Sequence, residues 1–164
     1  MRIEQHPKFL AQLVRHEGLE LTPYRCTEGA LTIGYGHNLD ANPIPDIHAG
    51  TRITKERARR ILVEDCRKLA DKLDRVFSWW RRLNEPRQAV ILNMAFNMGV
   101  GTYSAEKHKG TGLSGFPRML EALREGDYER AADEMLDSKW RRDVKNRACE
   151  LAAQMQTGEW QEGV

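Results

Sequence analysis

Apolar residues recur at helical spacing near the start of the chain, and the spacing changes after residue 18. Four apolar side chains share one face of residues 7–16: Phe9, Leu10, Leu13 and Val14. This spacing predicts an amphipathic helix that ends before Gly18. From residue 19 to residue 39, apolar and polar residues alternate instead, and Glu28-Gly29 suits a turn. The segment is therefore predicted to form a small β-hairpin.

A second and longer helical pattern follows a proline-punctuated loop at residues 42–50. Thr54 suits the N-cap of this helix, which is predicted to span residues 54–76. Its apolar stripe consists of Ala58, Ile61, Leu62, Leu69 and Leu73. The opposite face carries Arg57, Arg60, Glu64, Arg67, Lys68 and Asp71. Because both signs of charge are mixed there, we interpret this face as solvated rather than as a nucleic-acid site.

Shorter helical patterns fill most of the remaining chain. They cover residues 78–83, 86–98, 116–125, 127–138 and 139–155, with a glycine-rich loop expected at residues 99–115. The predicted fold is α+β and mostly α-helical: a small N-terminal α+β lobe, a long connecting helix and a helical C-terminal lobe. A cleft between two lobes is a common ligand site.

Length and composition favour one domain with its own core. The chain has 164 residues, of which 40% are hydrophobic and 30% charged, and it can bury a core without disulfides. A formal net charge of +2 is too small to indicate a nucleic-acid-binding protein. Cys26, Cys66 and Cys149 have neither metal-site nor CxxC spacing, which favours free thiols made in a reducing compartment.

The first candidate for chemistry is Glu17, at the C-terminal end of the first predicted helix. The helix dipole disfavours negative charge there, and a general acid must hold a proton near neutral pH. Cys26 follows nine positions later and Thr32 another six. The hairpin can fold back over the helix end and bring the three together. By spacing alone the trio is a suggestive constellation, since an isolated Glu is usually a surface residue and an isolated Cys a small buried one.

Other motifs indicate no chemistry. Gly34-Tyr35-Gly36-His37 lacks the third glycine of a dinucleotide loop and precedes no helix, and the glycines at 99 and 101 fail for the same reason. The five histidines form no HExxH motif or Cys/His cluster, so no metal site and no cofactor is predicted. Two cysteines and three tryptophans fit core packing, although aromatic rings also stack on sugars: Cys66, Cys149, Trp79, Trp80 and Trp140.

Several segments, taken in order, resemble the phage-type lysozymes, glycoside hydrolase family 24. They are Glu17-Gly18, Tyr24, Cys26, Glu28-Gly29, residues 32–37, 93–99 and 111–116, Ser138-Lys139-Trp140 and Asn146-Arg147. The E-x8-D/C-x5-T triad of that family stands here as Glu17, Cys26 and Thr32. The resemblance implies a single lysozyme-like domain over residues 1–164. Its lobes would be residues 18–53 and residues 1–17 plus 77–164, joined by residues 54–76.

The resemblance also implies an endolysin that hydrolyses the β-1,4 bond between N-acetylmuramic acid and N-acetylglucosamine in bacterial peptidoglycan. Glu17 takes the position of the general acid, and Thr32 that of the residue that helps to hold the attacking water. Cys26 takes the position of the second catalytic group, which is Asp in many relatives. The family's substrate-contact positions fall near Asn38, Phe96, Met119 and Glu134.

Two departures from the family pattern bear on mechanism. A thiol with an ordinary pKa of about 8.5 is mostly neutral at pH 7, and a neutral thiol neither acts as a good base nor stabilises an oxocarbenium-like transition state. Cys26 therefore acts as a thiolate, acts as a nucleophile, or leaves most of the work to Glu17. Residues 101–110 resemble an insertion beside the cleft, interpreted either as a glycan contact or as a mobile surface loop.

Three other functions stay open at this point. A lytic transglycosylase acts on the same bond and needs only one carboxylate, although Thr32 favours hydrolysis. A catalytically silent protein would only bind peptidoglycan. A cationic last helix would instead kill by acting on membranes, which the small net charge disfavours.

The expected partners are the glycan strands of peptidoglycan, with no nucleic acid and no membrane anchor. No sustained heptad or apolar edge demands a second subunit, so a monomer is expected. The N-terminal residues lack the apolar run of a signal peptide or membrane helix. We therefore expect accumulation in the host cytoplasm. Action on the periplasmic wall would follow release through a holin, without direct contact between the two proteins.

Overall fold

The computed structural model describes residues 1–162, and its first α-helix is α1 (Pro7–Glu17). Gly18 ends this helix with a φ of 70°, which favours glycine. The apolar face formed by Phe9, Leu10 and Leu13 is buried, as the spacing predicts. The predicted helix is therefore confirmed, and it places Glu17 at the last helical position.

The strands β1 (Glu20–Arg25), β2 (Leu31–Gly34) and β3 (His37–Asn38) form one antiparallel sheet in that order. The predicted hairpin is confirmed but gains a third strand, which is too short for an alternating pattern to reveal it. The turn between β2 and β3 uses Gly34 and Gly36, whose φ angles of 67° and 84° favour glycine. This turn carries Gly36 back to the end of α1.

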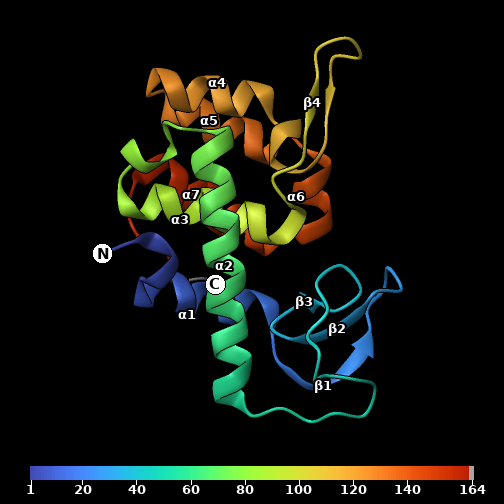
Figure 1. Cartoon of the computed structure of the whole chain (residues 1–164). Coiled ribbons are helices and arrows are strands. Elements are labelled where there is room, and N and C mark those ends of the chain that lie inside the picture. The colour runs from blue at the N-terminus through green and yellow to red at the C-terminus, as the bar shows by residue number, and fades with distance from the viewer. Residues whose placement is uncertain (163–164) are drawn as a thin grey trace.

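The long helix α2 (Lys55–Val76) begins at Thr54, whose side chain accepts a hydrogen bond from the backbone N–H of Arg57. Its buried stripe consists of Ala58, Leu62, Cys66, Ala70 and Leu73. A Cβ placed on Gly34 would lie 3.5 Å from the Cβ of Ala58, so the sheet packs closely on this helix. Figure 1 shows the sheet beside the N-terminal half of α2, α1 near the middle of α2, and the later helices around its C-terminal half.

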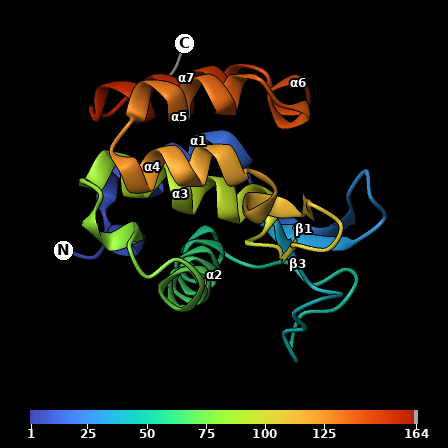
Figure 2. The ribbon, with the colours of Figure 1, turned by 90° about the horizontal axis from the view of Figure 1, so that it is seen from above.

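The C-terminal helices pack around α3 (Glu85–Met98), whose residues from Ala89 to Ala95 are all buried. The others are α4 (Pro117–Glu125), α5 (Tyr128–Leu136), α6 (Lys139–Val144) and α7 (Asn146–Thr157). Viewed along α2, α3 lies between α2 and the layer of α5 and α7 (Figure 2). One cluster of buried apolar side chains runs from Ile33 in the sheet to Leu151 in α7, so the two ends of the fold share a core.

Two helical predictions are wrong in detail. Within residues 78–83, only a 3-10 turn, η2 (Trp80–Arg82), is helical. Residues 139–155 form two helices, because Lys145 adopts a φ of 52° and interrupts the run. Apolar periodicity does not register such a single-residue break. A further 3-10 turn, η1 (Ile3–Gln5), precedes α1.

The segment 99–115 is not the unstructured loop that its glycines predict. It contains a hairpin of β4 (Tyr103–Ser104) and β5 (Lys109–Gly110), followed by the 3-10 turn η3 (Gly112–Gly115). The hairpin extends beyond the helices (Figure 1). A Cβ on Gly101 would clash with the backbone of Thr111, and one on Gly110 with that of Ser114. These glycines therefore permit close approach of two chain segments rather than looseness.

Burial settles the predictions made for the cysteines and tryptophans. Cys66 and Trp80 lie in the core, as predicted. Cys149 is exposed, so its predicted core position is wrong; it lies on the solvent face of α7. Among the helices of residues 1–162, none has the length and apolar character needed to cross a bilayer. The division of the chain into lobes stays a prediction.

Candidate functional site

The carboxylate of Glu17 lies where the end of α1, the β2–β3 turn and α3 meet. A Cβ placed on Gly36 would lie 3.2 Å from Oε2 of Glu17 and 3.8 Å from Cε1 of Phe96. The turn therefore passes directly over both side chains, and glycine at position 36 leaves room for them. The side chain of Glu17 is 17% exposed, so it is largely shielded yet reachable by solvent.

Arg147, at the start of α7, compensates the charge of Glu17. Its Nη2 lies 2.9 Å from Oε1 of Glu17, and the Arg147 side chain is only 10% exposed. The helix dipole alone disfavours a carboxylate at this position, but the guanidinium supplies an opposing positive charge. The dipole argument from sequence is therefore incomplete, because it omits a partner 130 residues away.

Cys26 and Thr32 are brought together by the β1–β2 hairpin. The N–H of Cys26 donates to the carbonyl of Ala30 at 3.0 Å, and the Thr32 hydroxyl donates to the same carbonyl at 3.0 Å. The backbone N–H of Glu28 lowers the pKa of the Cys26 thiol, and further hydrogen bonding at Ala30 and Thr32 adds to this despite partial burial. The half-exposed thiol is therefore biased toward the thiolate, whereas Thr32 is buried.

Tyr24, on β1, has a phenol whose pKa is raised. Burial is the main cause, and negative charge at Cys26, Glu20 and Glu17 raises it further. The meeting of Glu17 with Cys26 and Thr32 stays a prediction.

The four predicted substrate-contact residues divide between two cavities. Asn38 and Phe96 line one of about 390 Å³, together with Gly36 and two exposed lysines of α2, Lys68 and Lys72. Met119 and Glu134 line a second, of about 710 Å³, between α4, α5 and the β5–η3 segment. The structure therefore pairs these residues but does not gather all four at one place.

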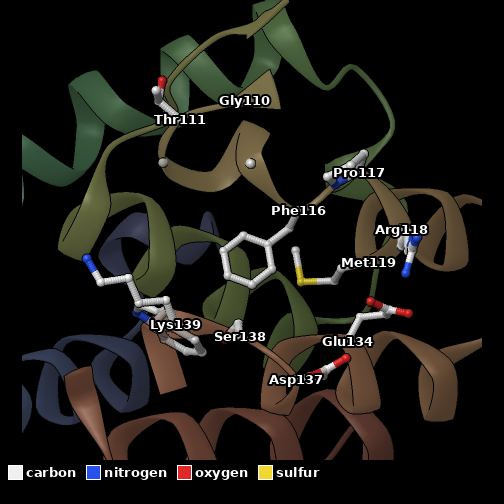
Figure 3. A pocket seen from close by; sticks show the side chains of 13 residues that line it. Gly110, Thr111, Phe116, Pro117, Arg118, Met119, Glu134, Asp137, Ser138 and Lys139 are labelled. Atoms are coloured by element: carbon white, nitrogen blue, oxygen red, sulfur yellow. The ribbon is translucent and has the colours of Figure 1, made fainter. Parts of the chain in front are cut away.

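The larger cavity has an apolar floor and a charged rim. In Figure 3, the ring of Phe116 and the thioether of Met119 point into this cavity. Glu134 and Asp137 lie on one side of it and Lys139 on the other. Trp140 packs edge-on against Phe116, with ring centroids 6.1 Å apart. An apolar floor with charged groups at its edge suits a ligand that has both aliphatic and ionic parts.

Arg147 and Asn93 belong to the site but were given no role by sequence reasoning. Oδ1 of Asn93 accepts hydrogen bonds from Nε and Nη2 of Arg147 at 3.0 and 2.8 Å. Asn93 is fully buried in α3, where a polar residue in an apolar helix face is a signal in itself. No metal-binding group of three or more His, Cys, Asp or Glu side chains occurs within residues 1–162.

Comparison with known proteins gives a consistent family. The model of the phage lysozyme family matches residues 14–156. The pre-baseplate central spike protein Gp5 of Enterobacteria phage T4 is 33% identical over 165 residues, which cover 89% of this chain. The chain spans only 27% of that spike protein's length.

Two further relatives align over most of both partners. An endolysin of Acyrthosiphon pisum secondary endosymbiont phage 1 is 29% identical over 133 residues, covering 81% of this chain and 77% of the endolysin. A probable T4-type lysozyme 1 of Dictyostelium discoideum is 24% identical over 162 residues, covering 87% of this chain and 89% of that protein.

Proposed function

Because this chain belongs to the phage lysozyme family, we propose that it is a cell-wall hydrolase. In this proposal it cleaves the β-1,4 bond between N-acetylmuramic acid and N-acetylglucosamine by adding water. Glu17 is the general acid of this reaction. The observation that carries the proposal is its carboxylate, shielded beneath the Gly36 turn and beside Phe96, with Arg147 at 2.9 Å.

Glu17 gives its proton to the leaving glycosidic oxygen as the bond breaks. Negative charge then develops on its carboxylate, and the guanidinium of Arg147 is already in place to stabilise that charge. The pair is shielded from water, which strengthens its attraction in the transition state. Arg147 therefore favours the product of proton transfer without moving.

In this proposal, Cys26 and Thr32 act on the attacking water. The backbone N–H groups of the hairpin lower the pKa of the Cys26 thiol, so a larger fraction is thiolate than in a free cysteine. A thiolate accepts a proton from water and stabilises positive charge on the sugar ring. The Thr32 hydroxyl, next to it on the hairpin, helps to hold that water.

The two cavities divide the substrate between them. Asn38 and Phe96 contact the glycan, where Phe96 offers an aromatic face to a sugar ring. Met119 and Glu134 contact a more distant part of the peptidoglycan strand, which has both aliphatic and ionic groups. No cofactor enters this mechanism.

Clearing of a purified peptidoglycan suspension tests the proposal most simply. The protein is expected to lower the turbidity of the suspension, and it should also clear outer-membrane-permeabilised cells. If the protein instead sediments with the wall and leaves the turbidity unchanged, it is a silent peptidoglycan-binding protein and the proposal is wrong.

Thiol labelling tests the role of Cys26. In the native protein, an alkylating reagent should label Cys26 and Cys149 but not Cys66, because burial raises the pKa of the Cys66 thiol and shields it. Labelling should abolish wall cleavage, and mass spectrometry of peptides reports which thiols are modified. A Cys149→Ser variant should still be inactivated.

The matched variant is Cys26→Ser, assayed for any activity that it retains. Residual cleavage in this variant should resist the reagent, although Cys149 is still labelled. Inactivation that persists in Cys26→Ser would remove Cys26 from the reaction.

Because two relatives are named endolysins, the biological role that we favour is lysis of the host cell to release progeny phage. In that role the protein accumulates in the host cytoplasm as a monomer and reaches the periplasmic wall after a holin opens the membrane. The similarity to a spike protein favours a second setting, in which the same chemistry serves a phage particle. Immunoblots of purified particles and of cell lysate separate the two.

A further inference from the structure

A polar chain of five shielded side chains begins at Glu17 and continues through Arg147, Asn93 and His16 to Glu150. Nδ1 of His16 lies 3.0 Å from Nδ2 of Asn93. Nε2 of His16 lies 3.2 Å from Oε2 of Glu150. The side chains of His16 and Glu150 are 6% and 4% exposed. Both are thus buried titratable groups, and the proposed mechanism gives neither a role.

Glu150 carries a negative charge throughout the neutral range. Burial opposes this, but nearby His16 and the hydrogen bonds from Arg15 and Gln12 lower the pKa of Glu150 to about 2. Nη1 and Nη2 of Arg15 donate to the carboxylate at 2.7 and 2.9 Å, and Gln12 donates to it at 2.6 Å. At this end of the polar chain, the ionised carboxylate of Glu150 can therefore only accept hydrogen bonds.

The near end is a fixed donor, and together the two ends determine the tautomer of His16. Arg147 only donates, so Oδ1 of Asn93 faces it and Nδ2 of Asn93 faces His16. Nδ1 of His16 must then accept, which leaves the proton on Nε2. Nε2 has no hydrogen-bond partner within the described residues, so its N–H interacts with Oε2 of Glu150, 3.2 Å away, through charge. The N–H groups of Arg147, Asn93 and His16 that link the polar chain therefore all point in the direction from Arg147 toward Glu150.

A second proton on His16 breaks this order. Protonated Nδ1 would face the N–H donors of Asn93, and rotation of the amide would turn those donors toward Arg147 instead. In either case Asn93 loses a hydrogen bond, and Arg147 loses part of its support against Glu17. Glu150 from α7 is the charged group in contact with His16. Arg15 on α1 pairs with Glu150, and Arg147 from α7 pairs with Glu17 at the other end of the polar chain.

We propose that His16 is a positioning residue whose neutral, Nε2-protonated form holds Arg147 against Glu17 through Asn93, so that protonation of His16 lowers the rate of wall cleavage. The proposal rests on the proposed function of Glu17. It predicts an effect on kcat with little effect on KM, since the polar partners of His16, Asn93 and Glu150, line neither of the two cavities. It also predicts an acidic limb in the pH profile that belongs to His16.

His16→Gln separates this role from a structural one. The glutamine amide presents an acceptor to Asn93 and a donor to Glu150, as neutral histidine does, but it does not titrate. We expect near wild-type kcat on soluble glycan strands at about pH 7.5 and, relative to wild type, roughly threefold or more activity at about pH 5. His16→Leu, which removes both contacts, should lower kcat about tenfold at both pH values.

The exposed His48 provides the matched control, because His48→Gln should leave the profile of the wild type unchanged. Melting temperatures at each pH identify any variant that is merely unfolded. The proposal is wrong if wild type and His16→Gln have the same pH profile.

A second readout needs no activity. Nitrogen-15 NMR of the histidine rings at about pH 7.5 should show His16 with its proton on Nε2. A proton on Nδ1 would overturn the inference even if Glu17 proves to be the general acid. The correct tautomer in a protein that cleaves nothing would leave the polar chain intact and reject the proposed function instead.

Discussion

Glu17→Gln is expected to lower the rate of peptidoglycan cleavage by roughly 10²–10⁴-fold, the usual contribution of a positioned general acid. Glutamine keeps the shape of the side chain, but its amide cannot donate a proton to a leaving oxygen. The carboxylate is 17% exposed and forms one ion pair, so the fold should survive. Rates are measured on purified peptidoglycan, and melting temperature reports on folding.

Glu129→Gln is the matched control for this substitution. Glu129 is exposed on α5, where loss of one carboxylate should change neither rate nor melting temperature. Near-normal cleavage by Glu17→Gln would remove Glu17 from the mechanism. Killing of cells by that variant, without wall cleavage, would instead favour action of the C-terminal segment 139–155 on membranes.

Asp65→Asn is expected to cost about 2–3 kcal/mol of stability at pH 5, because it breaks a largely buried ion pair. Nδ1 of His37 lies 2.8 Å from Oδ2 of Asp65, and Nε2 lies 2.8 Å from the carbonyl oxygen of Asn42. Both ring nitrogens thus face acceptors, which only the doubly protonated ring satisfies fully. The hydrogen bond to Asp65 raises the pKa of His37, against the opposing effects of burial and of Lys68.

The pH dependence of this loss follows from the direction of the shift. Since the pKa of His37 is higher in the folded than in the unfolded chain, its stabilisation is complete below about pH 6.5, the ordinary value. It is lost as pH rises through the folded-state value. The cost of Asp65→Asn should therefore shrink as pH rises toward 9.

Urea unfolding of both proteins across this pH range measures the effect, and Asp133→Asn controls for the loss of an exposed carboxylate. A cost of Asp65→Asn that is constant or grows with pH would contradict this interpretation of the pair.

Local spacing predicts α1, α2 and the sheet well, because the signals lie within each element. Thr54 caps its helix, and the apolar faces of α1 and α2 are buried as their periods require. The β4–β5 hairpin and the break at Lys145 escape prediction for a physical reason. Both depend on contacts with other segments, such as the close approach of Gly110 to Ser114.

The candidate site divides in the same way. Glu17, Cys26 and Thr32 lie in one segment of 16 residues, and their spacing predicts that they converge. The hairpin brings Cys26 and Thr32 together at the carbonyl of Ala30. Arg147 and Glu150 reach the end of α1 only through the packing of α7 on it. No short-range sequence pattern predicts that the guanidinium of Arg147 lies beside Glu17 at the end of α1.

Mass spectrometry of the ends produced from purified peptidoglycan tests the central claim most directly. Hydrolysis of the β-1,4 bond with Glu17 as the acid predicts glycan products with reducing N-acetylmuramic acid ends, absent from a digest with Glu17→Gln. Products with 1,6-anhydro ends would identify a lytic transglycosylase and contradict the role of Thr32 with the attacking water.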